Sequence, residues 1–432
     1  METQNQNLAL DLLSFIDESP TAWQAVAVLC NRLAAQGYLP YDSRKELRPG
    51  DRRYLTVNGS ALFAFDVGTE PLEQGFRMIG AHIDSPALKI KPNSIIRQEG
   101  CIKLSTEVYG GPILSSWFDR PLSLAGRVVL KTADPLHPEV RLVDFRRPIL
   151  ILPSLAIHMN KSVNDGLKIE PQKMLLPILA LADSGNPAPG DTFTTLVGEA
   201  LDLDHELIAD YDLLAYESTP GGLIGWNNEL ICTPRLDNLG MVYAAAEALL
   251  DCGPHAGINL IACFDNEEVG SHSSQGADTH YLRDLLEQII YSLGGTRGDF
   301  LGCLKPSFLI SADQAHAVHP NFSEFADASN RPKINQGPVI KSSASHSYTS
   351  DADSSAVFQA LCLKAGVPWQ TFVNRSDLRG GSTIGPIFTE HLPVRSVDVG
   401  NPIWAMHAIR ETGGVQDHAS MLAVFREFFS LL

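Results

Sequence analysis

The apolar residues at the start of the chain follow a helical spacing, which then gives way to short strands. The helical pattern covers residues 7–36, is interrupted at Ser19-Pro20 and ends at Gly37. The next apolar runs, ALFAFDV and FRMIGAHID, are short and β-like. The N-terminal region is therefore expected to form helices followed by strands.

The pattern changes twice further along the chain. Residues 92–234 hold many short alternating runs, such as CIKLSTEVYG, LAGRVVLK and YDLLAYES, which is typical of a mostly β segment. After Pro234, the run NLGMVYAAAEALLDCG has helical spacing, with Asn238 as a candidate cap and Gly253 as its end. Apolar strands such as INLIACFD and PSFLISAD then alternate with helical stretches, and QDHASMLAVFREFFSLL is an amphipathic C-terminal helix.

Continuous apolar strands that alternate with helices predict an α/β fold whose largely parallel sheet is covered on both faces. We expect residues 1–91 and 235–432 to form one such domain. Residues 92–234 are expected to form a separate β-rich domain that interrupts it.

Metal-capable side chains stand where the apolar strands end or where the helix after Pro234 begins. They are His82, Asp84, Asp237, Glu267, Glu268, Asp313 and His407. Because ligands gather at the carboxyl ends of strands in open α/β sheets, these side chains are expected at one edge. Helix capping is the ordinary alternative for Asp237 and Asp313. Capping does not explain two adjacent glutamates, or a histidine and an aspartate two residues apart.

The spacing of these residues suggests different roles. In an extended segment residues i and i+2 point to the same side, so His82 can bind a metal while Asp84 orients its imidazole. Adjacent Glu267 and Glu268 point in opposite directions if the chain is extended. If the chain turns there, one glutamate can bind a metal while the other acts as general base.

The number of candidate ligands favours two metal ions. A lone catalytic zinc needs about three protein ligands. The five candidates are His82, Asp237, Glu268, Asp313 and His407. They suit two ions about 3.5–4 Å apart if one carboxylate bridges them. The motifs H-E-x-x-H, G-x-x-x-x-G-K-[ST] and G-x-S-x-G do not occur, so the chain lacks the signatures of other common catalytic sites.

Composition narrows the range of partners. The formal net charge of −17 disfavours nucleic acid and anionic membranes as partners. The apolar runs are too short for a membrane span, and the polar start METQNQNLAL shows no secretory signal. The 7 scattered cysteines, without C-x-x-C, indicate reduced thiols and a cytoplasmic protein.

With these residues identified, the chain resembles the aspartyl aminopeptidase family of dinuclear zinc exopeptidases. The resemblance rests on GAHIDSP, PRLDN, DNEEVGS, SADQAHAVHPN and MHAIRE, which occur in this order and run nearly end to end. It implies a zinc-exopeptidase-like sandwich, with a mixed, largely parallel sheet between helices and an inserted, mostly β dimerisation domain. It also implies a homo-oligomer, a tetrahedral dodecamer built from dimers, that acts on peptides.

The resemblance also implies a role for each matching residue. The five candidate ligands would bind two zinc ions, or cobalt or manganese, with Asp237 bridging and Glu267 as general base and acid. His316, Lys341 and Tyr348 would contact the substrate, with a preference for N-terminal Asp or Glu. His158 would reach a neighbouring subunit's active site; a zinc ligand and a buried histidine on an apolar strand are its alternatives.

Other functions remain open at this point. The enzyme could be an aminopeptidase of broad or neutral specificity, because a charge of −17 repels acidic peptides at long range. It could be a carboxypeptidase or deacylase of similar architecture, which activity on amino-blocked against free peptides would separate. An assembly or cargo protein that keeps the fold would be expected to lose Glu267, which is present.

Overall fold

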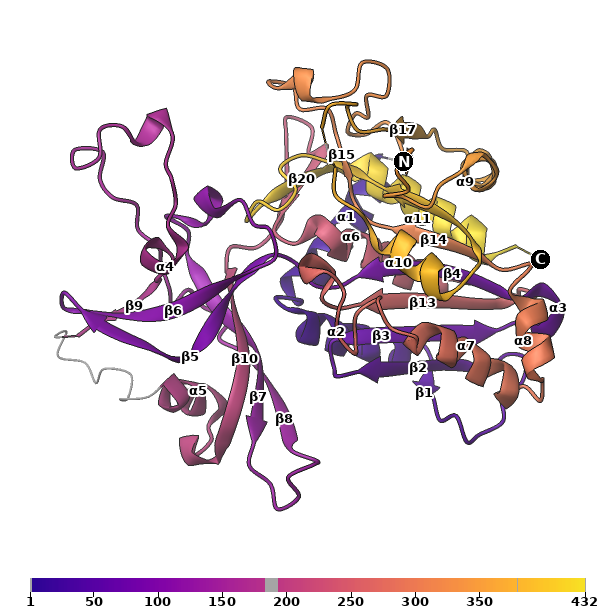
Figure 1. Ribbon diagram of the computed structural model, residues 1–432, viewed down its shortest axis with the longest axis horizontal. Helices are drawn as coiled ribbons and strands as arrows, with labels where there is room; N and C mark the ends of the chain where they lie inside the picture. Colours follow the sequence, from indigo (N-terminus) through magenta and orange to yellow (C-terminus); the bar gives the residue numbers. More distant parts are fainter. Residues whose placement is uncertain (1, 183–192, 379, 432) are drawn as a thin grey trace. The chain divides into compact units, whose positions relative to one another are not determined.

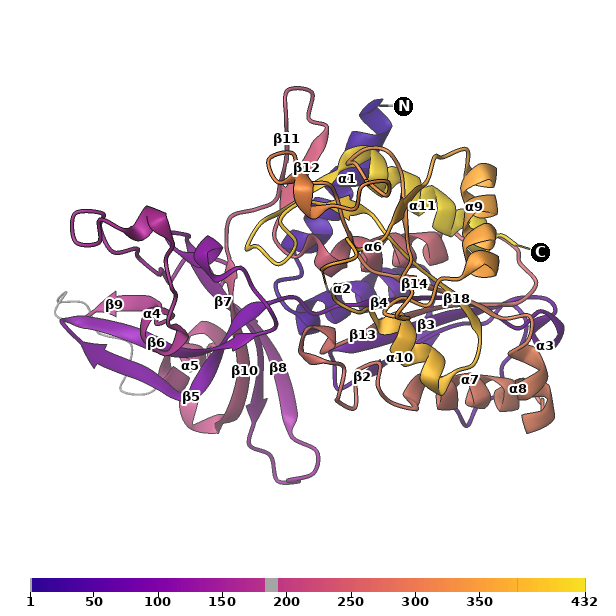
Figure 2. The ribbon, with the colours of Figure 1, turned by 45° about the horizontal axis from the view of Figure 1, so that its top comes forward.

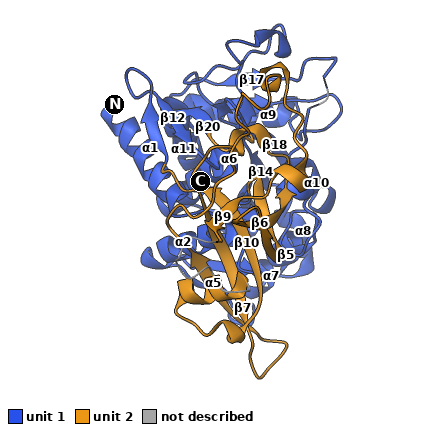
Figure 3. Cartoon of the chain, turned by 90° about the vertical axis from the view of Figure 1, so that its left-hand side faces the viewer, with its two compact units in different colours: residues 1–84, 221–406, 411–432 blue, residues 85–220, 407–410 orange. Residues whose placement is uncertain are grey.

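The computed structural model describes residues 2–182, 193–378 and 380–431. The chain forms two compact units, shown in Figure 3. The large unit comprises residues 1–84, 221–406 and 411–432, and the small unit comprises residues 85–220 and 407–410. The sequence predicted that the inserted domain covers residues 92–234, but residues 221–234 belong to the large unit. The reason is that strands β11 (Gly222–Ile224) and β12 (Leu230–Thr233) form a sheet with β20 (Glu411–Gly414) of the large unit.

The large unit is built around a nine-stranded sheet (Figure 1). Its strands, in spatial order, are β1 (Leu39–Pro40), β2 (Arg52–Val57), β3 (Ala61–Val67), β13 (Ile258–Phe264), β4 (Phe76–His82), β14 (Phe308–Ala312), β18 (Arg395–Gly400), β16 (Val339–Lys341) and β17 (Gln370–Phe372). The four central strands β13, β4, β14 and β18 run parallel, whereas β2–β3, β3–β13 and β16–β18 pair antiparallel. The predicted mixed, largely parallel sheet is confirmed.

Helices cover both faces of this sheet, as Figure 2 shows. One face carries α1 (Glu2–Asp17), α2 (Ala22–Ala35), α6 (Leu236–Leu250), α9 (Ala352–Ala365) and α11 (Val415–Phe429). The other face carries α7 (Tyr281–Ser292), α8 (Arg297–Cys303) and α10 (Ile384–His391). Side chains of β13 alternate between the two cores: Ile261 and Cys263 pack into the first, Leu260 and Ala262 into the second. Each face is therefore removed from water.

The helix boundaries confirm most of the predicted elements and correct one. The interrupted N-terminal pattern forms α1 and α2, and the amphipathic C-terminal run forms α11. Asn238 is not the cap of α6, which begins at Leu236. Asn238 lies inside the helix with non-helical torsion angles, and its side-chain amide donates a hydrogen bond to the carbonyl oxygen of Ala312, 2.9 Å away.

The small unit contains a six-stranded, fully antiparallel sheet. In spatial order its strands are β8 (Glu139–Asp144), β7 (Leu122–Leu130), β10 (Ile208–Glu217), β5 (Ala87–Gln98), β6 (Cys101–Tyr109) and β9 (Ile178–Leu181). Helices α4 (Pro171–Met174) and α5 (Phe193–Leu201) accompany it. Leu124, Val128 and Leu213 belong to its own apolar core, so this unit does not borrow its core from the large one.

The remaining elements are short. They are α3 (Pro71–Gln74), β15 (Ala315–His316), β19 (Pro402–Ile403) and the 3-10 turns Leu114–Trp117, Val163–Asp165, His205–Leu207, Glu267–Val269 and Ser323–Phe325. Among the described residues, no helix has the length and apolar character needed to cross a membrane.

Candidate metal centre

Three neighbouring parallel strands end at one edge of the large sheet. Strand β4 lies between β13 and β14, and Phe264 at the end of β13 stands opposite His82 at the end of β4. On the other side, β14 ends at Ala312, directly before Asp313. The segments that carry Glu267, Glu268 and Asp313 therefore leave the sheet beside His82, where parallel strands collect ligands.

His82 is the residue around which the other side chains gather. Its Nε2 lies 3.3 Å from Asp237 Oδ1 and 3.5 Å from Asp313 Oδ1. Its Nδ1 lies 3.1 Å from the backbone carbonyl oxygen of Asp84, which can only accept a hydrogen bond. This contact favours the tautomer with the proton on Nδ1 and presents Nε2 to the two carboxylates as a ligand atom.

Asp84 holds the loop that carries the two glutamates. Its Oδ1 accepts a hydrogen bond from the backbone N–H of Glu267 at 3.1 Å, and its Oδ2 accepts one from Glu268 at 3.2 Å. The carboxylate is 3.5 Å from His82 Nδ1, further than the Asp84 backbone oxygen. The chain turns here, with Asn266 at φ 62° and a 3-10 turn over Glu267–Val269. Asp84 thus links the imidazole to the glutamate loop.

Asp237 is positioned by a residue that the sequence did not single out. Its backbone N–H donates to Glu411 Oε2 at 2.8 Å, and Glu411 is buried. The side-chain amide of Gln314 donates to the carbonyl oxygen of Leu236 at 2.9 Å. These bonds fix the start of α6 against the end of β14. Asp237 and Glu411 are 174 residues apart in the sequence, so no local sequence pattern could have predicted their contact.

The electrostatics of the centre reflect its concentration of carboxylates. The pKa of Glu267 is raised to about 7 by burial above all, with the carboxylates of Asp313 and Asp84 adding to the rise and His82 opposing it. Burial by itself lowers the pKa of His82, but the carboxylates around it outweigh burial and hold this pKa well above its ordinary value. A buried group of this composition favours a cation.

The donor set fits divalent metal ions. Ligand atoms of His82, Asp237 and Asp313 lie within 4.8 Å of one another, and so do those of His82, Glu267 and Glu268. Imidazole nitrogen and carboxylate oxygen are ligands that zinc accepts. Four predicted ligands, His82, Asp237, Glu268 and Asp313, thus come together with Glu267 in the large unit.

Two histidines of the predicted site belong to the small unit. His407 lies in its segment 407–410, where Nδ1 is 3.1 Å from the carbonyl oxygen of Gly111. A proton on Nδ1 would again present Nε2 as the ligand atom. His158 is exposed in a turn, not buried on a strand, so the alternative of a buried structural histidine is wrong.

The predicted substrate residues lie near one another in the large unit. Lys341 ends strand β16, is buried, and donates hydrogen bonds to Asp313 Oδ2 at 3.3 Å and to the Gln314 carbonyl oxygen at 2.9 Å. Its ammonium group is 5.5 Å from the ring centroid of Tyr348. His316 and Tyr348 both have ring contacts with Phe372. Lys341 is therefore already paired with Asp313, a predicted metal ligand. This contact was not predicted from the sequence.

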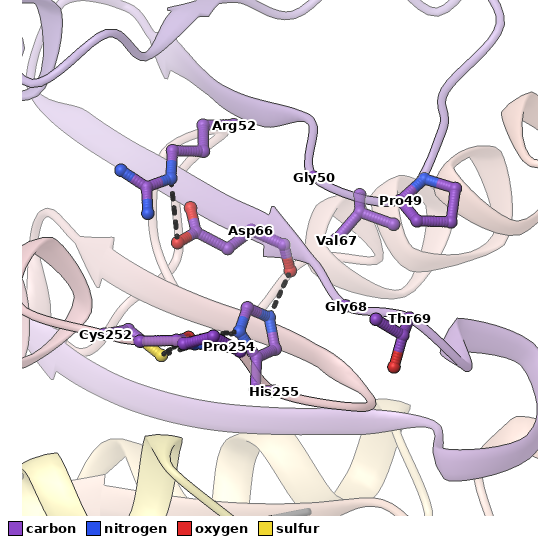
Figure 4. Close-up of a pocket in the computed structure, with 11 residues that line it drawn as sticks. Pro49, Gly50, Arg52, Asp66, Val67, Gly68, Thr69, Cys252, Pro254 and His255 are labelled. Carbon is purple, nitrogen blue, oxygen red and sulfur yellow. Dashed lines mark hydrogen bonds and ion pairs between the residues drawn. The ribbon is translucent and has the colours of Figure 1, made fainter.

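A polar pocket of the large unit, away from the proposed ligands, holds a cysteine, a histidine and an aspartate, the residue types of a catalytic triad (Figure 4). It has a volume of about 440 Å³ and is lined by Cys252, His255 and Asp66 among others. His255 Nδ1 lies 3.6 Å from Cys252 Sγ, but Nε2 faces the backbone oxygen of Asp66 at 3.4 Å and not its carboxylate. Burial raises the pKa of the Cys252 thiol to about 11, which makes it a poor nucleophile.

Comparison with known proteins identifies the family. Residues 15–429 match the family model described as aminopeptidase I zinc metalloprotease (M18). The chain is 50% identical over 427 residues to a probable M18 family aminopeptidase 2 of Clostridium novyi, covering 98% of each. It is 43% identical over 427 residues to the protein of the same name from Stutzerimonas stutzeri, covering 97% of each.

Solved structures show the same fold. A chain in the Ape4–Nbr1 complex superposes with a TM-score of 0.95 at 34% identity, covering 99% of this chain and 86% of that one. The mApe1 dodecamer of S. cerevesiae gives a TM-score of 0.83 at 25% identity, covering 98% and 96%. The chain belongs to the M18 family of metallopeptidases. It is an aminopeptidase of that family, as the sequence predicted, and a zinc metalloprotease by family.

Proposed function

We propose that this aminopeptidase removes single N-terminal residues, with a preference for Asp or Glu, at a centre of two zinc ions. The proposed ligands are His82, Asp237, Glu268, Asp313 and His407, with Asp237 as the bridge. The observation that carries the proposal is that His82 belongs to two groups of ligand atoms, one with Asp237 and Asp313 and one with the glutamates. Cobalt or manganese could occupy the same donor set.

Bound at this centre, zinc ions would lower the pKa of water toward about 7 and polarise the first peptide carbonyl. Glu267 then accepts the proton of the attacking water and donates it to the departing amine. Glu267 suits both steps because its carboxylate lies in one group of ligand atoms with His82 and Glu268, beside the proposed ions. Asp84 keeps this glutamate in place through the backbone N–H bond described above.

The test of this proposal is hydrolysis of a panel of peptides with and without chelator. Peptides with a free N-terminus should lose one residue at a time, because the free amine can sit against a carboxylate or a metal. Amino-blocked peptides should be resistant. Preferential cleavage of blocked peptides, or release from the carboxyl end, would replace the aminopeptidase by a deacylase or carboxypeptidase with this fold.

We further propose that the enzyme is a homo-oligomer, a tetrahedral dodecamer built from dimers, in which the small unit mediates dimerisation. The segment around His158 supports this proposal. Leu155, Ile157 and Met159 are 57%, 50% and 71% exposed, so the segment offers apolar surface on both sides of the histidine. Its occupant would be a second copy of this chain, whose active site His158 would enter.

We expect His158→Ala to lower kcat/KM while metal content stays at the wild-type level, because His158 would touch substrate from the partner and not bind zinc. Metal analysis and peptide hydrolysis on the assembled protein measure both quantities. His205→Ala, at another exposed histidine of the same unit, is the matched control and should leave both unchanged.

Mixed oligomers sharpen this test. When His158→Ala and Glu267→Gln subunits are dissociated and reassembled together, a mixed dimer contains one site with both wild-type residues. Partial activity should reappear in the mixture. If confirmed mixed assemblies remain inactive, His158 acts within its own subunit, and zinc loss in the single variant would make it a ligand.

For the acidic preference we expect Lys341→Ala to reduce kcat/KM for N-terminal Asp or Glu. A charge-assisted contact is worth about 1.5–3 kcal/mol, or roughly 10- to 150-fold. N-terminal Leu or Ala should be affected far less. An ammonium group has three donors, so Lys341 can bond Asp313 and Gln314 and still donate once to a substrate carboxylate.

The pairing of Lys341 with Asp313 defines the contrary outcome. If the lysine acts only on Asp313, Lys341→Ala should weaken hydrolysis of acidic and apolar N-termini equally. Lys305→Ala, at an exposed position, controls for the loss of a positive charge. A wild-type preference for neutral N-termini would disprove the acidic specificity and favour the enzyme of broad or neutral specificity.

A further inference from the structure

A second group of histidines and carboxylates lies in the large unit, away from the residues proposed to bind zinc. Asp278 precedes helix α7, and Glu390 and His391 end helix α10. One ligand atom from each of these three residues lies within 4.8 Å of the others. His272 and His280 contact the same group, so three imidazoles and two carboxylates meet on the surface.

Asp278 is at the centre of this group. Its Oδ1 lies 2.9 Å from His391 Nε2, and its Oδ2 lies 2.6 Å from His272 Nδ1. The ring of His280 is 4.7 Å from that of His391, centroid to centroid. Both oxygen atoms of Asp278 therefore face imidazoles, and these imidazoles come from two separate segments of the chain.

The spacing suits a small divalent ion. Zinc binds nitrogen and oxygen ligands at about 2.0–2.2 Å, which puts neighbouring ligand atoms of a tetrahedral site roughly 3.3–3.5 Å apart. Asp278 and His391 are slightly closer than this, and exposed Glu390 can approach by a change of rotamer. His391 would carry its proton on Nδ1 when Nε2 binds the ion, and a water would complete the coordination.

The scaffold beneath the group is anchored in the apolar core. Ala277 and Leu282, on either side of Asp278, are buried in the core on this face of the sheet. Phe388, one helical turn before His391, is buried in the same core and its ring lies 4.8 Å from that of Phe264. Figure 2 shows α7 and α10 on the same side of the sheet. The two backbone segments are thus held in place without an ion, as a prepared site requires.

An ordinary ion pair does not require this arrangement. His137 and Asp134 in the small unit form such a pair, with Nδ1 2.7 Å from Oδ2 across a turn of four residues. In the group around Asp278 a second carboxylate, Glu390, adds negative charge next to the first. A divalent cation would balance the charge of both carboxylates and take nitrogen and oxygen ligands together.

We propose that Asp278, Glu390 and His391 form a peripheral site for a divalent cation such as Zn²⁺, with His272 orienting the Asp278 carboxylate. The ion would fasten the end of α10 to the loop 266–278. This loop is closed by hydrogen bonds: Asp278 N–H donates to the Ser271 carbonyl oxygen, and Ser273 Oγ donates to Asn266 Oδ1. Glu267 and Glu268 stand at its start, so the ion would stabilise the segment that carries the proposed base.

The consequence for catalysis rests on the proposed roles of Glu267 and Glu268, whereas the existence of the site does not. The experiment is equilibrium dialysis of the assembled enzyme against graded free Zn²⁺, with metal counted per chain. Wild type should bind one ion more per chain than His391→Ala or Glu390→Gln at saturation. Because the result is a difference, it holds however many ions the central site contains.

A second measurement separates binding from folding. Zn²⁺ added beyond the filling of the central site should raise the Tm of wild type, and His391→Ala should abolish that further rise. His137→Ala removes an imidazole–carboxylate pair of the same kind elsewhere and should bind as many ions as wild type. If His391→Ala does not assemble, Glu390→Gln changes an exposed proposed ligand and gives the same comparison. His272→Ala, which removes only an orienting partner, should weaken Zn²⁺ binding without changing the count at saturation.

Equal metal counts in wild type, His391→Ala and Glu390→Gln, at every Zn²⁺ concentration that leaves the protein in solution, would overturn the proposal. The group would then be a set of hydrogen-bonded ion pairs that hold α10 to the loop. Fewer than two ions in the central site, together with a retained difference of one ion, would contradict the proposed dinuclear centre and leave the peripheral site intact.

Discussion

The Glu267→Gln variant is expected to keep the metal content of the wild type and to lose at least ~10²-fold in kcat, the usual contribution of a general base. Glutamine has nearly the shape of glutamate but cannot accept the proton of the attacking water. The backbone N–H of residue 267 would still donate to Asp84, so the loop should keep its conformation. Steady-state hydrolysis of a free-N-terminus peptide and metal analysis of the same sample measure the two quantities.

A surface substitution of the same kind serves as the control. Glu73→Gln changes an exposed glutamate of α3 and should leave turnover unchanged. Near-normal turnover of Glu267→Gln would show that another group takes the proton. Loss of both ions would show instead that Glu267 is a ligand. Metal content is measured for this reason, because Glu267 shares a group of ligand atoms with His82 and Glu268.

Removal of the metal is expected to abolish activity, and Zn²⁺, Co²⁺ or Mn²⁺ should restore it, because a donor set rich in carboxylates with imidazole accepts several such ions. Loss of a residue that only hydrogen-bonds to a metal ligand typically lowers metal affinity about 10–100-fold. His82→Ala removes a proposed ligand itself and should lower metal affinity by more than that. The reason is that His82 Nε2 faces Asp237 and Asp313 directly. His407→Ala should also lower bound metal if this residue completes the ligand set.

The control for these variants is His255→Ala, which removes another buried histidine of the large unit. Its metal content should remain that of the wild type, since its ring faces Cys252 and the backbone of Asp66. Full activity of the metal-free wild-type chain would reject the metal-dependent mechanism altogether. Normal metal content in His82→Ala would place the ions elsewhere.

Much of the fold could be predicted from the sequence because its pattern is local. The helices α1, α2 and α11 and the buried strands β4, β13 and β14 follow directly from the spacing of apolar residues. All seven metal-capable residues lie within a few residues of a strand end or the start of α6. The sequence could therefore locate them once each segment's type was known.

The errors and omissions have a common cause, which is that side-chain partners are chosen by distant segments. Asparagine is a residue type common at helix caps, but the side-chain amide of Asn238 instead donates a hydrogen bond to the carbonyl oxygen of Ala312 in strand β14. Lys341 is an unremarkable lysine in a Ser-rich stretch until β16 brings it to Asp313. Glu411 and Asp237 are 174 residues apart, and only the pairing of β20 with β12 brings them together.

The sequence by itself determined which segments are helices and strands, which side chains stand at their ends, and the family to which the chain belongs. Apolar periodicity and short motifs suffice for this, since they involve residues close in the chain. The tertiary structure alone decided that β4 lies between β13 and β14, that Asp84 holds the glutamate loop, and that His391 meets Asp278. Such contacts depend on the packing of whole elements, because the free energy of burying their apolar faces selects the neighbours and no local pattern records the choice.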